Sequence, residues 1–148
     1  MSKNFRQKAG FTLIEIMLAV GLMTAFLSLS VPVFQSFIYN NDLDTAINSG
    51  VRALRLAQEN ARGMYYDDAW GVKFTTNEIV LFKGNSYASR DTSYDSTYPI
   101  STGISVSGTS EYIFAKFTGT PTGTGTVTLT ENTKSLTITI NEQGNVTY

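Results

Sequence analysis

One long apolar stretch dominates the first third of the chain. From Phe11 to Tyr39 the only charged side chain is Glu15, and the chain becomes more polar from Asn40. About 20 apolar residues are enough to cross a membrane as a helix, and residues 11–30 alone reach that length. The pattern therefore predicts a helix over 11–39 whose first half is transmembrane.

The pattern becomes amphipathic over residues 40–63. Apolar or small residues recur three or four positions apart and mark one helical face: Leu43, Ile47, Gly50, Leu54, Ala57 and Ala61. Gly63 follows the last of them and is typical of a helix end. We expect this half of the helix to pack on a folded domain. Pairing with a second helix as a coiled coil is the alternative.

After residue 63 the period shortens to two, which indicates β-strands. The stretches 70–74 and 79–82 flank a polar turn and predict a hairpin. Further strands are expected at 104–106, 112–117, 126–130, 135–140 and 146–148. The polar, tyrosine-bearing stretch 84–102 has no clear period and is expected to be a long exposed loop. Residues 64–148 are therefore predicted to form an antiparallel β domain.

The composition of the chain excludes several kinds of functional site. Its 148 residues include neither Cys nor His, which excludes disulfides, thiolate chemistry, the usual zinc sites and a histidine general base. From Met64 onward, five Lys and Arg residues stand against eight Asp and Glu residues, so nucleic acid is not an expected partner. A tethered enzyme using only Asp, Glu, Ser, Thr or Tyr is conceivable, but no constellation indicates one. We expect no catalytic residue, no cofactor and no metal.

Charges flank the apolar stretch unevenly. Lys3, Arg6 and Lys8 precede it, whereas Asp42 and Asp44 follow it. The positive-inside rule then predicts a single-pass inner (plasma) membrane protein, with a cytoplasmic N-terminus and the C-terminal domain outside the cytoplasm. An ordinary signal peptide is the alternative. Its apolar part is usually about 7–15 residues and ends in small residues, unlike this run.

The residues Gly10-Phe11-Thr12-Leu13-Ile14-Glu15 resemble the class III leader of type IV pilins and type II secretion pseudopilins. The shared pattern is a short basic leader that ends in glycine, followed by phenylalanine, with glutamate fifth in the mature chain. The resemblance continues through the apolar stretch to Pro32. The order of several later residues resembles the GspH/FimT-type branch of pseudopilins and minor pilins: Trp70-Gly71-Val72-Lys73-Phe74, Leu81-Phe82-Lys83-Gly84, Tyr87, Arg90-Asp91 and the closing Gly144-Asn145-Val146.

This resemblance implies a pilin-like α+β fold. One long N-terminal helix, with a transmembrane first half and an amphipathic second half, would pack on a C-terminal antiparallel β-sheet domain. The implied segments are a cleaved leader (1–10), a transmembrane and filament-core half (11–39), an amphipathic half (40–63) and a β-rich globular domain (64–148).

The resemblance also implies roles for single residues. A prepilin peptidase would cut between Gly10 and Phe11 and N-methylate the new Phe11 amine. Glu15 would then contact the Phe11 amine of a neighbouring subunit in the filament. The alternative is that Glu15 is only a tolerated polar residue near the headgroups. Pro32 would kink the helix, unless it is an ordinary proline of a transmembrane helix.

The implied function is that of a structural subunit, not an enzyme. The chain would be a pseudopilin or minor pilin of a type II secretion pseudopilus or type IV pilus and would support protein secretion. Its partners would be the prepilin peptidase, other pilin or pseudopilin subunits and the inner-membrane assembly platform, with membrane insertion before assembly. A minor pilin for DNA uptake or surface adhesion is the alternative.

Two further groups of side chains are candidates for binding. Four carboxylates could supply oxygen ligands to calcium, although acidic residues in loops are usually only solvated: Asp67, Asp68, Asp91 and Asp95. Four tyrosines and one arginine could contact a partner or stack on sugars or bases: Tyr87, Tyr94, Tyr98, Tyr112 and Arg90. We favour a partner contact. No spacing brings Glu78 and Glu111 together as a catalytic pair.

Overall fold

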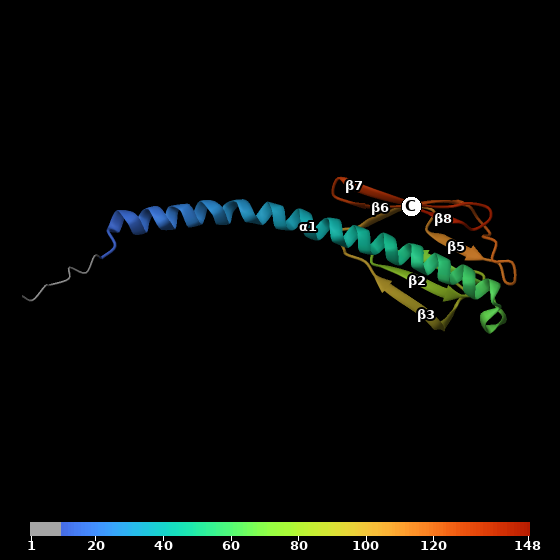
Figure 1. Ribbon diagram of the computed structural model, residues 1–148. Helices are drawn as coiled ribbons and strands as arrows, with labels where there is room; N and C mark the ends of the chain where they lie inside the picture. Colours follow the sequence, from blue (N-terminus) through green and yellow to red (C-terminus); the bar gives the residue numbers. More distant parts are fainter. Residues whose placement is uncertain (1–9) are drawn as a thin grey trace, which may run out of the picture. The chain divides into compact units, whose positions relative to one another are not determined.

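The computed structural model describes residues 10–148, without the side chains of 29–40. The described elements are α1 Leu13–Arg62, the 3-10 turn η1 Tyr65–Asp67, and the strands β1 Trp70–Phe74, β2 Glu78–Lys83, β3 Asp91–Pro99, β4 Ser105–Gly108, β5 Glu111–Phe114, β6 Gly125–Glu131, β7 Lys134–Ile140 and β8 Val146–Thr147 (Figure 1). The chain divides into two compact units, Met1–Ile38 and Tyr39–Tyr148. We call the second unit the head.

Across the part of the chain that is described, no helix is long and apolar enough to cross a membrane. The transmembrane first half of the predicted fold is therefore wrong, and so is the single-pass membrane location. Helix α1 begins at Leu13, so Phe11 and Thr12 precede it.

The packed half of α1 confirms the amphipathic pattern. Its predicted stripe is buried in the head, whereas Asp44, Arg55 and Glu59 are exposed. The stripe packs on the head's own strands, so the coiled-coil alternative is not needed to explain it.

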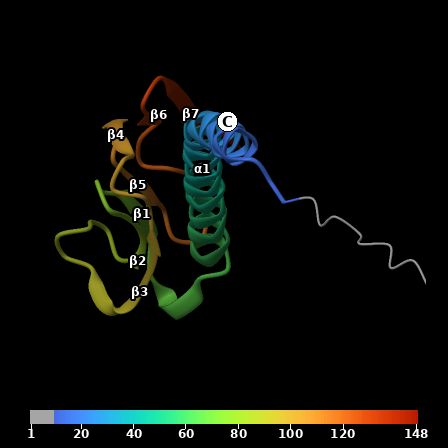
Figure 2. The same ribbon diagram turned by 90° about the vertical axis from the view of Figure 1, so that its left-hand side faces the viewer.

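The head contains two sheets where the sequence predicts a single β-sheet domain. One has the strand order β3-β2-β1-β5 and the other β4-β6-β7-β8, and both are antiparallel. The predicted first hairpin is confirmed, since β1 pairs with β2 from Trp70↔Lys83 to Phe74↔Ile79. The second half of α1 runs along both sheets (Figures 1 and 2).

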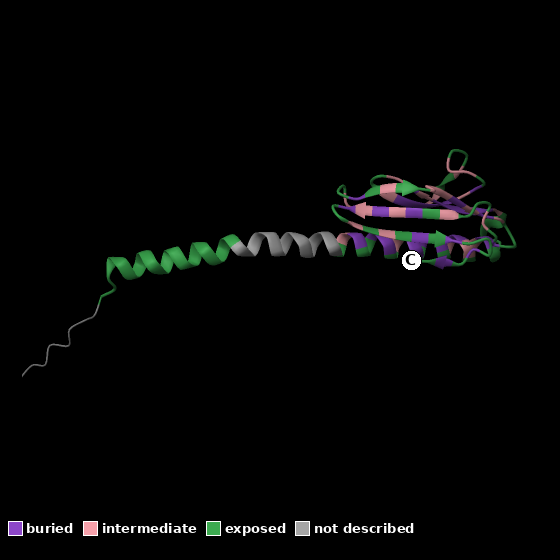
Figure 3. Ribbon diagram, turned by 90° about the horizontal axis from the view of Figure 1, so that it is seen from above, coloured by how far each residue is buried: buried purple, intermediate pink, exposed green. Residues whose placement is uncertain are grey.

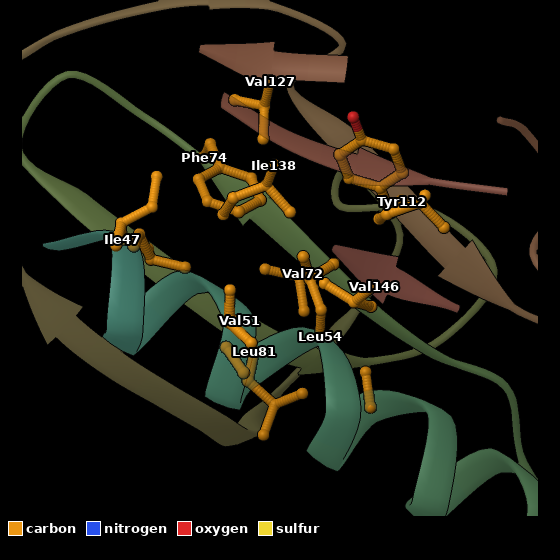
Figure 4. Packing of buried hydrophobic residues seen from close by; sticks show 14 of the residues in the cluster. Ile47, Val51, Leu54, Val72, Phe74, Leu81, Tyr112, Val127, Ile138 and Val146 are labelled. Carbon is orange, nitrogen blue, oxygen red and sulfur yellow. The ribbon is translucent and has the colours of Figure 1, made fainter. Parts of the chain in front are cut away.

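The core fills the space between α1 and the two sheets. Ile47, Val51 and Leu54 of the helix point toward Phe74 and Ile138 of the strands (Figure 4). The helix approaches closely because Gly50 has no side chain: a Cβ there would lie 2.9 Å from Phe74 Cε1 and 3.0 Å from Ile138 Cδ1. All described members of the core lie between Leu43 and Val146, so the head has a complete core of its own.

The predicted loop over residues 84–102 is wrong in its middle, because Asp91–Pro99 forms strand β3. This strand pairs with β2, with an irregularity between Leu81 and Lys83. The inward positions Tyr94 and Tyr98 are only half-buried, and Ser96 lies between them. The strand therefore lacks the apolar alternation that identifies a strand in a sequence.

The end of α1 supports a first prediction. Gly63 follows the helix as expected, but the left-handed residue is Met64, with φ 52°. A left-handed conformation costs a non-glycine residue about 1–2 kcal/mol. We expect Met64→Gly to raise the free energy of unfolding by about 0.5–1 kcal/mol, after allowing for the greater freedom of glycine in the unfolded chain. Denaturant titration measures this difference. Tyr65→Gly is the control, because Tyr65 is not left-handed; an equal gain there would contradict the explanation.

Candidate functional site: the start of helix α1

The first turn of α1 is closed by a reciprocal cap. Thr12 precedes the helix, and its Oγ1 accepts a hydrogen bond from the Glu15 N–H at 3.3 Å. In return, the Thr12 N–H donates to Glu15 Oε2 at 3.4 Å. This is a capping box, in which a Thr and a Glu three positions later satisfy N–H groups that the helix leaves free. Both bonds are long compared with the usual 2.9–3.0 Å, so their contribution to stability is small.

Glu15 also carries the only negative charge at this end of the chain. Among the residues that the structure describes, no cation forms an ion pair with it. A carboxylate near a helix N-terminus is stabilised by the helix dipole, by about 0.3–1 kcal/mol at an exposed site. The site therefore holds a locally ordered carboxylate that remains available to a cation from outside.

An apolar surface surrounds this carboxylate. The large side chains of the first helical turns are more than half exposed, and residues 13–28 appear as exposed throughout in Figure 3. Next to Glu15, Phe11 is 81% exposed, Leu13 78% and Ile14 70%. Contiguous exposed apolar surface of this kind marks a place where another surface binds.

The predicted cut site lies just before this surface. Gly10 and Phe11 are exposed and precede the helix, and no atom lies within 4 Å of where a Gly10 Cβ would be. An extended, uncovered glycine is suited to entering a protease cleft. The rest of the predicted leader, residues 1–9, and the side chain of Pro32 lie outside the described residues, so the cleavage and the kink stay predictions.

Comparison of the chain with known protein families, with curated proteins and with solved structures gives no match. The resemblance of the leader is therefore carried by the residues around Gly10, Phe11 and Glu15 alone.

The four acidic candidates do not converge on one site. Asp67 Oδ1 lies 2.6 Å from Lys116 Nζ, and Asp95 Oδ2 lies 2.8 Å from Arg90 Nε. Asp68 and Asp91 accept hydrogen bonds from nearby backbone N–H groups. In the described part of the chain, no three acidic side chains are grouped so that they could hold a metal ion.

The tyrosine group proves to be partly structural. Tyr112 is buried in β5, and burial raises the pKa of its phenol. Arg90 stacks on Tyr87 at 3.7 Å from the ring centroid and donates to the Tyr87 carbonyl at 2.8 Å. Tyr94 and Tyr98 pack against the core. The side chains that were expected on the exposed loop 84–102 therefore pack against other parts of the head. A partner contact through their half-exposed edges is untested.

Two features are not predicted from the sequence, and only the first belongs to this site. The Thr12-x-x-Glu15 spacing is a known start signal for a helix, and it could have been identified directly. The second feature is a strained end of the head, where Met64, Tyr66, Asp67 and Phe117 all have positive φ. Met64, Tyr66 and Phe117 are also large and exposed. No sequence signal marks it, since bulky residues rarely adopt this conformation.

Proposed function

We propose that the chain is a structural subunit of a filament of the pilin type, either a type II secretion pseudopilus or a type IV pilus. The observation that carries the proposal is the exposed apolar start of α1, with one capped carboxylate in its first turn. Such a surface is stable in water only when something covers it, and identical helices from other subunits can do so.

The energy for assembly comes mainly from burial. Removing apolar surface from water contributes about 25 cal/mol per Å², and each exposed Leu, Ile, Met or Phe of this helix adds to that sum. Burial has a cost at Glu15, because an isolated carboxylate in a low-dielectric core is unfavourable. A cation from a neighbouring subunit offsets this cost.

Cleavage would create that cation. Hydrolysis of the Gly10–Phe11 peptide bond leaves a carboxylate on Gly10 and a free amine on Phe11, which stays positively charged when methylated. The amine begins the mature chain, four residues before Glu15. A prepilin peptidase is therefore the first proposed partner, and further filament subunits are the second.

Gly10→Leu tests the cleavage step. We expect the variant to remain uncut in cells that contain the peptidase, because a bulky side chain would meet the walls of the protease cleft. Mass spectrometry of the N-terminus distinguishes the uncut chain from a methylated chain that begins at Phe11. Gly21→Leu is the matched control, since a Cβ at Gly21 also meets no atom within 4 Å, and this variant should be cut normally. Detection of a mature Phe11 terminus in Gly10→Leu would refute the cleavage site.

The supporting observations favour a structural subunit over a DNA-binding one. Residues 39–148 contain eight Lys and Arg residues against eleven Asp and Glu residues, and Arg90 is already engaged by Asp95. A protein that binds DNA usually presents a basic surface. We therefore propose filament assembly, and not DNA binding, as the function of the chain.

A further inference from the structure

Strand β6 carries one inward side chain that does not fit its pattern. Residues alternate along the strand, so that Val127, Leu129 and Glu131 face the core. The two apolar residues are completely buried, and Glu131 is only 4% exposed. A carboxylate thus occupies a position where the pattern calls for an apolar residue.

The Glu131 carboxylate has no partner among the described residues. Neither oxygen accepts a hydrogen bond there, and both are shielded from solvent. Gly103 lies so close that a Cβ at that position would be 2.9 Å from Glu131 Oε1. The loop 100–104 therefore closes directly over the carboxylate.

The charged groups around Glu131 do not neutralise it. From α1 the group that acts on it is Asp42, which is also an acid. Lys134 lies opposite Glu131 in the register of β6 and β7. Its Nζ atom, however, forms an ion pair with Asp44 Oδ1 at 3.3 Å. The loop 100–104 and strand β4 contain no titratable residue. An ionised Glu131 would be a buried charge without compensation, which is unfavourable.

The direction of the pH effect follows from this environment. Burial raises the pKa of Glu131, and the nearby Asp42 raises it further. The closed head therefore binds a proton at pH values where an open, solvated Glu131 has lost it. The closed state is most stable below the ordinary pKa of glutamate and loses stability as the pH rises from there through the raised pKa.

We propose that Glu131 is a proton-operated latch at the start of the head: when it is protonated, loop 100–104 and the β6–β7 turn close on α1, and its ionisation opens them. A cleft of about 330 Å³ lies next to this point, lined by Asp42, Thr45, Ala46, Pro99, Ile100 and Ser101. Glu131 does not line the cleft, and its carboxylate oxygens are shielded from solvent in the closed head. The latch does not depend on the proposed filament function.

Hydrogen exchange of the purified full chain tests the latch. After correction for the intrinsic exchange rate, we expect amides in 100–104 and 131–134 to lose protection as the pH rises. The loss should reach up to about tenfold for each unit by which the closed pKa exceeds the open one. In Glu131→Gln the corrected protection should be independent of pH. The control is Glu142→Gln, because Glu142 is exposed, and it should behave like the unaltered chain. Protection that is independent of pH in the unaltered chain would refute the latch, as would a pH dependence that persists in Glu131→Gln.

A second measurement does not require that variant to fold. Titration of the Glu131 carboxyl carbon by NMR in the unaltered chain should give a midpoint above that of the exposed Glu142. Asp42→Asn should lower the Glu131 midpoint, because it removes the nearby negative charge. A Glu131 midpoint equal to that of Glu142, or one that does not respond to Asp42→Asn, would overturn the proposal.

Discussion

In the proposed filament, changing Glu15 to Gln will raise the subunit concentration that assembly requires while leaving the helix intact. Gln at this position can still complete the capping box with Thr12, so the substitution removes the charge and little else. Losing one partner of a buried charge pair costs about 2–5 kcal/mol. At about 1.4 kcal/mol per factor of ten, the subunit concentration required for assembly should rise about 30-fold or more. Sedimentation of processed subunits over a concentration series measures this directly.

Two companion variants separate the charge from the cap. Thr12→Ala removes the capping hydroxyl but keeps the carboxylate, at a small local cost to the helix because the capping bonds are long. Glu15→Ala removes the charge and the bond from the Thr12 N–H, whereas Thr12 Oγ1 can still accept from the N–H of residue 15. If the charge drives assembly, Thr12→Ala assembles nearly normally, and Glu15→Gln is about as defective as Glu15→Ala. If Glu15→Gln assembles normally and Thr12→Ala does not, Glu15 serves only as a cap.

Changing Gly71 to Val will strongly destabilise the head. A Cβ at this position in β1 would overlap Phe82 Cζ and lie 2.8 Å from the Tyr112 carbonyl oxygen. The carbonyl belongs to the paired strand β5 and cannot move without breaking the sheet. Overpacking of this kind costs about 3 kcal/mol or more, which corresponds to a fall in Tm of about 10 °C or more for a domain of this size.

Thermal unfolding followed by circular dichroism and by the fluorescence of buried Trp70 checks this expectation. The matched control is Gly123→Val, since no atom lies within 4 Å of a Cβ at Gly123 and its φ is not left-handed. It should leave Tm nearly unchanged. A Gly71→Val variant as stable as this control would show that Phe82 and the paired strand β5 shift more easily than their packing suggests.

The sequence predicts most strands of the head because threonine alternates with large apolar residues. The pattern Val127, Leu129 and Ile138 marks the inner face of the β6–β7 hairpin, and both strands appear where they were expected. Strand β3 is not predicted because the polar residue Ser96 interrupts the inward face of the strand. The division into two sheets is not predicted either, since a period of two identifies strands but not the strands with which they pair.

The candidate site is predictable in part and for a similar reason. Gly10, Phe11 and Glu15 are identified by a local pattern, and the local geometry leaves them exposed. The transmembrane prediction rests on apolar length alone and is wrong for the described helix. The alternation identifies Glu131 as the third inward residue after Val127 and Leu129. The environment of its carboxylate is not predictable in the same way, because the neighbouring Gly103 and Asp42 are distant in sequence.

The way in which α1 is covered has a consequence for biosynthesis. Lys134 contacts Asp44 across ninety positions of sequence, and Ile138 packs at Gly50. The chain leaves the ribosome N-terminus first, at about 5–20 residues per second. The face of the helix that packs in the core is therefore synthesised early. The second sheet, which covers half of this face, is synthesised last. For several seconds each nascent chain therefore carries a helix whose apolar face is uncovered, and this face can aggregate until the final hairpin emerges.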